Sequence, residues 1–461
     1  MTVRTRTPND SLGALISEAR WTNGEFARAV NRVGTETGLS LRYDDSAVCH
    51  WLAGTNPRER VHPAILEAFS RRLNRPVTAT EAGLRKTALS SATPADTVEG
   101  LIELGSADMD PSRRAVLGAV GLFSVALTIP HYEDVMGRFE TVAHTPRARI
   151  GYGEVNAVIA MTEKISEIDD QFGGRTARPL AAAFLVNTIV PHLKADAPED
   201  VKRAMLSAAA DHLYLTGYMA MDERLDGLAQ RYYTQALKLA GAASDHLTYC
   251  TTLRGMSVQA VDLGHSRLSL RLADSASAAS PQAGPRMLAF LAGQQAHAAA
   301  QAGDRSTALV KMHEAETAMD KAESKAKAKA FGSYDPSSLA YHVAQVRYEL
   351  GDKAAAVDAL EDSDRLRHSI YQRGRVRHLG LLAERKLEIG RLDEACVDWN
   401  RMLDDYPRVQ SGRCDDRYRA MMAALRPYTK NVHAKHVWER ARAIDSTSPV
   451  QGGGTITWRP I

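Results

Sequence analysis

AMDERLDGLAQRYYTQALKLA, residues 220–240, opens a series of five stretches that place small residues at fixed offsets from one anchor position. The anchors lie 40, 39, 48 and 39 residues apart and are Arg224, Gly264, Gly303, Gly351 and Gly390. Small residues stand seven positions before each anchor: Gly217, Ser257, Ala296, Ala344 and Ala383. Others stand five positions after each: Ala229, Ser269, Ala308, Ala356 and Ala395. Bulky side chains stand nine positions after four of the anchors: Tyr233, Met312, Leu360 and Trp399.

This register predicts pairs of closely packed helices, because small residues let two helices approach while bulky neighbours fill the remaining space. A period of about 34 to 45 residues with two helices per unit is typical of an α-solenoid. We predict five such units over residues 213–404 and a closing helix pair over 411–444. Further helices are expected at 154–172, 178–193 and 200–215, outside the register. An α-solenoid usually binds other molecules rather than catalysing a reaction.

Composition supports an all-α protein. Aromatic residues make up 6% of the 461 residues and alanine is abundant, which favours packed helices and argues against an all-β fold. The four cysteines form no CxxC pair, so we expect a reduced, cytoplasmic protein without a disulfide framework. Residues 1–90 hold 13 Lys and Arg against 9 Asp and Glu, a modest basic excess that fits an anionic partner at that end.

The chain shows no secretory or membrane segment. The start, MTVRTRTPND, contains no apolar stretch. The apolar run 115–129 follows two arginines, but it has 15 residues where a membrane helix needs about 20. We therefore expect a buried helix over 113–129 that serves docking or dimerisation, and no membrane association.

The N-terminal segment 11–84 divides into five short helical pieces, the last two at 63–73 and 79–84, and this is the size of a compact DNA-binding bundle. The third piece, 44–52, occupies the place of a helix that reads the major groove. We expect it to point Asp45, Ser46, Ala47, Cys49 and His50 outward. Arg42, Arg58 and Arg60 would contact phosphates on either side, and Arg4 and Arg6 would form a basic arm.

The acidic pair at this helix opposes DNA binding, because Asp44 and Asp45 repel phosphates. One of the two is expected to cap the helix, and Asp45 can accept a hydrogen bond from a cytosine amino group. A generic small helical bundle with scattered surface arginines remains the alternative.

The first helix of each repeat unit is expected to line a concave groove. The candidate groove residues are Asn187, Gln294, Gln295, Tyr341, Gln345, Arg375 and His378. A basic cluster could receive a carboxylate or an acidic peptide, and it comprises Arg365, Arg367, His368, Arg373, Arg375, Arg377 and His378. A solvated helix surface explains the cluster equally well, and a cap or internal hydrogen bond explains Asn187.

Catalytic motifs are absent from the sequence: it has no Walker loop, no GxSxG and no GxGxxG after a strand. His433 and His436 lack a suitably spaced carboxylate and make a poor metal site. We expect neither an enzyme nor a bound cofactor or metal.

Two resemblances extend this reading. The small-residue offsets, with Pro281 and Pro407 each 17 residues after an anchor, resemble tetratricopeptide (TPR) units.

The N-terminal segment resembles the lambda-repressor-like (XRE) helix-turn-helix domain of bacterial TPR-containing regulators. The stretches that carry this resemblance are LGALISEARW, EFARAVNRVG, LRYDDSAVCHWLAGTNPR and ILEAFSRRLNRPVTATEAGL. SRRAVLGAVGLFSVAL (112–127) is similar to the hinge of that group. Where the group usually keeps a glycine at the first anchor, this chain has Arg224, which predicts a looser turn.

The resemblance implies a transcriptional regulator with four parts. These are a helix-turn-helix domain (1–86), a linker with an apolar docking helix (87–149), a TPR-like repeat domain (150–445) and a flexible tail (446–461). The expected partners are double-stranded DNA, a second copy of the chain, and a peptide, small molecule or protein in the groove. The dimer would form through the solenoid or through the 113–129 helix. The alternative function is a TPR interaction scaffold whose bundle does not read DNA specifically.

Overall fold

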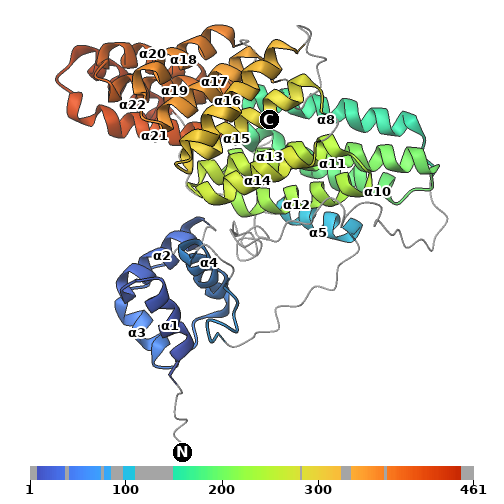
Figure 1. Cartoon of the computed structure of the whole chain (residues 1–461), viewed down its shortest axis with the longest axis horizontal. Helices are drawn as coiled ribbons and strands as arrows, with labels where there is room; N and C mark the ends of the chain where they lie inside the picture. Colours follow the sequence, from blue (N-terminus) through green and yellow to red (C-terminus); the bar gives the residue numbers. More distant parts are fainter. Residues whose placement is uncertain are drawn as a thin grey trace, which may run out of the picture.

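The computed structural model describes residues 8–36, 41–73, 77–84, 97–109, 149–280, 283–322, 334–367 and 371–447. Within these ranges the chain is all-α, and its single β-bridge joins Arg149 and Asp196. Figure 1 shows a small N-terminal bundle and a larger array of stacked helix pairs. The predicted all-α class is thus confirmed.

The N-terminal bundle is built around a cluster of aromatic side chains. Phe26 stacks on Phe69 with ring centroids 4.6 Å apart, and Trp51 meets Phe26 edge-on at 6.2 Å. The bundle comprises α1 (Asp10–Glu18), α2 (Asn23–Glu36), α3 (Asp45–Leu52), η1 (Glu59–Val61) and α4 (His62–Leu73). A further helix predicted at 79–84 is wrong: this stretch is a hydrogen-bonded turn that ends at Gly83, whose φ is 60°. One turn is too short to sustain a helix on its own.

Five helix pairs follow the predicted register. The pairs end at 405, next to the predicted 404, but they begin at 199 instead of 213, because the helix predicted separately at 200–215 is the first part of one continuous helix, Glu199–Asp222. Figure 1 shows the pairs side by side. The pairs are α11 (Glu199–Asp222) with α12 (Asp226–Ala242), α13 (His246–Asp262) with α14 (Ser266–Ala278), α15 (Pro285–Gln301) with α16 (Arg305–Asp320), α17 (Pro336–Glu349) with α18 (Lys353–Leu366), and α19 (Gln372–Glu388) with α20 (Leu392–Asp405). The predicted closing pair is α21 (Gly412–Leu425) and α22 (Val432–Thr447), with one-turn 3₁₀ segments η3 (Tyr406–Arg408) and η4 (Arg426–Tyr428) before and after α21.

The anchors are the residues at which the first helix of each pair ends. All five have positive φ, from 65° at Arg224 to 90° at Gly351. At Gly264 the turn closes by the bonds Gly264 N to Val261 O and His265 N to Ala260 O, a Schellman motif. The turn at Arg224 closes by the same two bonds: Arg224 N donates to Met221 O, and Leu225 N donates to Ala220 O. The expectation of a looser turn at Arg224 is therefore wrong.

The small residues before the anchors lie where paired helices touch. A Cβ added to Gly217 would come within 2.8 Å of the Tyr233 ring, so glycine is required there for the two helices to meet. Ala296, Ala344 and Ala383 are likewise buried. The expected role of this position in close helix packing is confirmed.

Helices before the first repeat complete the array. They are α8 (Tyr152–Phe172), α9 (Gly174–Phe184), the π-helical turn η2 (Leu185–Ile189) and α10 (Val190–Leu193). The predicted linker 87–149 contains a further helix, α5 (Thr97–Met109), which packs on α9, η2 and α12. Val98, Leu101 and Leu104 are buried there because they recur on one helix face. The predicted 113–129 helix, Arg4, Arg6, His368 and residues 448–461 of the tail lie outside the described residues.

The two ends of the array meet. Gln410 N donates a hydrogen bond to Phe172 O (2.7 Å), and Gln410 O accepts one from Arg175 N (3.1 Å). Helix α19 also contacts α8, and Arg224 pairs with Asp416 at 2.5 Å. We call this junction, between residues 172–175 and 410–412, the closing contact. It turns the row of helix pairs into a closed ring.

Candidate functional site

The interior of the ring is a chamber of two adjoining cavities, of about 270 and 420 Å³. Their lining comes from α8, the first helix of each repeat pair, α21 and the segments beside α17 and α18. The prediction that first helices line a concave surface is therefore confirmed. The residues shared by the two cavities are Asp170, Tyr218, Arg254, Ser338, Arg367, Tyr371 and Arg373.

Nine chamber positions follow one rule in the repeat register. Lining residues stand thirteen, ten or six positions before an anchor, which is one face of a helix. Those that obey the rule are Tyr214, Tyr218, Arg254, Phe290, His297, Ser338, Tyr341, Gln345 and Arg377. Sequence reasoning missed Arg254 and Tyr214, and this offset rule was the signal that could have found them.

Three chamber arginines are neutralised by carboxylates of the chain. Arg373 contacts Asp169 at 2.9 Å, Asp170 at 3.1 Å and Asp222 at 3.4 Å. The other two pairs join Arg385 to Glu388 (2.5 Å) and Arg417 to Glu384 (2.6 Å). Burial raises the pKa of Asp169 to about 8 despite the adjacent guanidinium.

Three other chamber arginines have no ion pair with a carboxylate among the described residues: Arg254, Arg367 and Arg377. The guanidinium of Arg254 stacks 4.0 Å from the centre of the Phe290 ring, and its buried Nε has no acceptor. Arg367 donates to Ser363 Oγ at 3.2 Å, while its Nε is also buried without an acceptor. Burial lowers the pKa of Arg367 and of Arg377, and the positive charge of Arg413 lowers that of Arg377 further. Asp262 acts on Arg377 and Asp335 on Arg367 without an ion pair, and six arginines line the larger cavity against three carboxylates.

The chamber histidines are neutral. Burial lowers the pKa of His297 to about 4 and depresses that of His342 further. The Nδ1 atom of His342 lies 2.7 Å from the Tyr334 hydroxyl, which can donate to it. These rings therefore supply polar and aromatic surface and no positive charge near pH 7.

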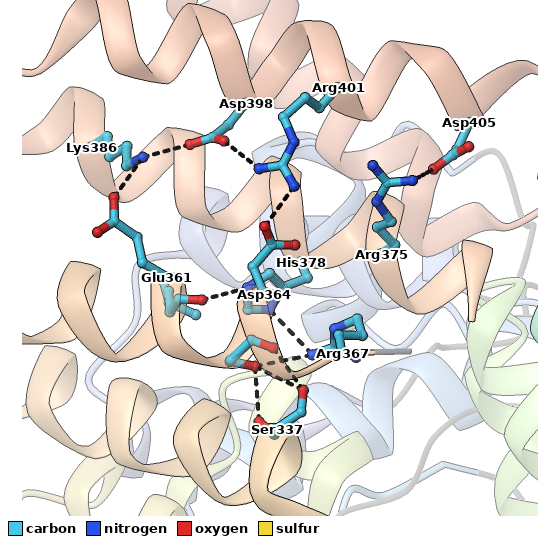
Figure 2. A network of polar contacts seen from close by, with 12 residues as sticks. Ser337, Glu361, Asp364, Arg367, Arg375, His378, Lys386, Asp398, Arg401 and Asp405 are labelled. Atoms are coloured by element: carbon cyan, nitrogen blue, oxygen red, sulfur yellow. Dashed lines mark hydrogen bonds and ion pairs between the residues drawn. The ribbon is translucent and has the colours of Figure 1, made fainter. Parts of the chain in front are cut away.

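A polar network fixes one wall of the chamber (Figure 2). Lys386 bridges Glu361 and Asp398, each at 2.8 Å, and so joins α18 to α20 through α19. His378 contacts Leu360 O at 2.9 Å with Nε2, and its Nδ1 lies 3.4 Å from Nη2 of Arg367 (Figure 2). The network therefore positions Arg367 at the chamber rather than leaving it free to turn toward solvent.

The predicted groove residues are divided between the chamber and other places. Tyr341, Gln345 and His378 line the chamber. Arg375 pairs with Asp405 at 2.9 Å, as Figure 2 shows. The remaining three do not line it: Gln294 donates to Ser257 Oγ (3.0 Å), Gln295 donates to Asp274 (2.9 Å), and Asn187 is exposed on the π-helical turn.

The predicted reading helix α3 has an exposed polar face. Val48 and Trp51 are buried in the bundle, whereas Asp45, Ser46 and His50 are exposed and Ala47 is half-buried. Asp44 is the N-cap and accepts from Ala47 N at 3.0 Å, which confirms that one acidic residue caps the helix. The predicted phosphate contacts Arg42, Arg58 and Arg60 are all exposed.

The connection from α2 to α3 ends in the described residues 41–44, which directly precede α3. Asn31 on α2 holds the end of this connection. Its side chain donates to Tyr43 O (2.8 Å) and accepts from Tyr43 N (2.9 Å). These two hydrogen bonds therefore fix the entry to α3 on the bundle.

Other kinds of site find no support within the part of the chain that the structure describes. It contains no group of three or more His, Cys, Asp or Glu side chains placed to hold a metal ion. Nor does any helix described there combine the length and apolar character needed to cross a membrane.

Buried histidines make stability depend on pH. Burial lowers the folded-state pKa of His212, His265 and His297 to about 4, below the usual 6.5. The unfolded chain therefore takes up protons first, so stability is lost as the pH falls from about 6.5 towards 4. Asp169, with its raised pKa, acts in the opposite direction between about 4 and 8. Burial also raises the pKa of Asp170, Glu349 and Glu384, but it lowers that of His342 and His378 as well, so five buried histidines act in the first direction. Thermal unfolding at pH 7, 6 and 5 should show a falling midpoint with a shallower dependence in a His212→Gln variant; a flat profile would contradict this account.

Comparison with known proteins identifies only the N-terminal bundle. Residues 12–85 match the family described as the SP15 N-terminal domain. No XRE or TPR family matches the chain, and no curated protein matches it. Residues 12–85 are thus similar to an SP15 N-terminal domain, and a long region of paired helices follows them.

Proposed function

We propose that this protein is a DNA-binding transcriptional regulator whose helical ring binds a small ligand and mediates dimerisation. In this proposal the N-terminal bundle acts as a lambda-repressor-like helix-turn-helix of the XRE type, and the ring is a TPR-like solenoid. The observation that carries it is the face of α3, where Ser46 and His50 are exposed on a helix held by buried Val48 and Trp51. Side chains in that arrangement can reach base edges in a major groove.

The surroundings of α3 support the same proposal. Exposed Arg42 precedes the helix, and exposed Arg58 and Arg60 follow it, so each side offers a phosphate contact. Because Asp44 is occupied as the helix cap, Asp45 is the acidic group left on the exposed face. Asp45 can then serve as an acceptor for a cytosine amino group.

In this proposal the ring regulates DNA binding. A homodimer would present two α3 helices to two half-sites. Ligand binding in the chamber would change the ring's geometry and so respace the two DNA-binding heads, which is an allosteric coupling between two distinct sites.

Selection from a random double-stranded DNA library, followed by mobility shift at about 0.15 M salt, tests the DNA-binding proposal. A sequence-specific reader survives salt that strips non-specific phosphate contacts. The Ser46→Ala/His50→Ala double variant should lose specific binding by at least about tenfold, because both side chains lie on the reading face. A Ser17→Ala control on the exposed surface of α1 should bind like the parent chain. Unchanged binding in the double variant would refute α3 as the reading helix.

The alternative is an interaction scaffold that binds a protein partner and does not read DNA. The exposed carboxylate of Asp45 favours it, because a carboxylate repels phosphates. Failure of the library to enrich any sequence would support the scaffold and exclude specific DNA reading.

A further inference from the structure

We infer that the chamber binds a small organic dianion that carries an aromatic or other flat group. This inference deepens the proposed sensing role by naming the class of ligand. It concerns binding alone, so it can be tested without DNA.

The charge of the chamber is the first reason. Arg254, Arg367 and Arg377 come from three elements, α13, the end of α18 and α19, and face a common cavity. None of them has an ion pair with a described carboxylate, although the neighbouring Arg373 has three. Asp262 offsets part of the charge of Arg377, and Asp335 part of that of Arg367. Holding partly buried guanidinium groups without a directly paired carboxylate is nevertheless unfavourable. A bound dianion would neutralise them.

The donor atoms are the second reason. A guanidinium group presents N–H donors in a planar fork that matches the oxygens of phosphate or carboxylate. The Nε atoms of Arg254 and Arg367 are buried and have no acceptor, so protein groups do not saturate either guanidinium group. The stacking of Arg254 on Phe290 and the contact of Arg367 with His378 hold both groups in place before any ligand arrives.

Size and lining indicate a small molecule. Cavities of about 270 and 420 Å³ lie within or just below the usual range for small-molecule pockets, roughly 300–1,000 Å³. Aromatic side chains from four elements line the smaller cavity: Tyr214, Tyr218, Phe290, Tyr334 and Tyr371. Such surfaces accept a flat organic group, while their hydroxyls offer further hydrogen bonds. A phosphate monoester and a dicarboxylate share the required dianionic chemistry.

Isothermal titration of the full chain with two probes, phenyl phosphate and phthalate, tests the inference at fixed ionic strength. Saturable one-to-one binding of at least one probe is expected, and which one binds identifies the anionic group. Benzyl alcohol, a neutral probe of similar size, should bind much more weakly. If neither dianion binds more tightly than benzyl alcohol, the inference is wrong.

Matched variants locate the binding. Arg254→Gln and Arg377→Gln should each weaken the affinity for the bound probe by about tenfold or more, because each removes charge-assisted hydrogen bonds. Arg365→Gln removes the same charge from an exposed position on α18 and should leave the affinity unchanged. Equal effects of all three substitutions would mean non-specific attraction and would overturn the inference.

Thermal unfolding without ligand separates a binding role from a structural one. Removing an arginine that lacks a carboxylate partner should leave the melting temperature unchanged or raise it. If Arg377→Gln lowers it substantially, Arg377 serves folding and the inference fails for that residue. DNA selection remains a separate measurement, so a chain that binds the dianion but enriches no DNA sequence would refute the proposed function and leave this inference intact.

Discussion

Replacing Gly173 by alanine is expected to lower the free energy of unfolding by about 3 kcal/mol or more. Gly173 has φ 88° and ψ 166°, a backbone conformation essentially restricted to glycine. An added Cβ would also lie 2.4 Å from Gln410 O, a backbone atom of the closing contact. Both the strain and the clash fall on the junction that closes the ring. Chemical denaturation with urea, followed by circular dichroism, measures the loss.

A control variant carries the strain of a positive φ without any clash. Gly264 has φ 77°, but an added Cβ there would meet no atom within 4 Å. Gly264→Ala should therefore cost only about 1–2 kcal/mol, the usual penalty of a left-handed conformation. Equal losses in the two variants would show that the closing contact contributes nothing beyond local strain.

Replacing Arg373 by methionine is expected to destabilise the chain by about 3–5 kcal/mol at pH 8. Arg373 contacts Asp169, Asp170 and Asp222, and burial raises the pKa of Asp169 and of Asp170 even with the guanidinium present. Without Arg373 these carboxylates would be buried with no counter-charge. Thermal or urea unfolding at pH 8 measures the loss.

The pH dependence of this loss distinguishes a charge effect from lost packing. The pKa of Asp169 should rise further in the variant. As the pH falls, protonation of this carboxyl group removes the uncompensated charge. The loss of stability caused by Arg373→Met should therefore be smaller at pH 6 than at pH 8. Arg408→Met removes a mostly exposed partner of Asp405 and should change stability by less than about 1 kcal/mol. A loss in Arg373→Met that is equal at both pH values would contradict the electrostatic explanation.

The repeat architecture could be predicted because its cause is local. A residue with positive φ must end each first helix, and small residues must stand where the two helices touch, so both leave marks at fixed offsets. Arg224 shows the limit of this reasoning. Its side chain lies within 2.5 Å of Asp416, almost two hundred residues away in sequence, and 4.0 Å from Asp262. An ion pair of that kind leaves no periodic trace in the chain.

The candidate site was predictable only in part for the same reason. The basic cluster on α19 was visible in the sequence, but its members face in different directions: Arg377 lines the chamber, whereas Arg375 pairs with Asp405. Gln294 and Gln295 stand on a first helix, yet they bond to neighbouring helices instead of facing the chamber. Helix α5 was missed because its polar ends resemble a linker, although Val98, Leu101 and Leu104 carry a helical period between them.

The closing contact gives the array a fixed circumference. In an open solenoid each unit touches only its neighbours, so units can be added or lost and the ends can fray independently. Here Gln410 must reach Phe172 and Arg175, and this requirement fixes how many helix pairs fit between them. Deleting one pair would separate those backbone partners even if every remaining pair kept its own packing. We therefore expect the described repeats to unfold as a single cooperative unit, because the loss of any one helix pair would break the closing contact.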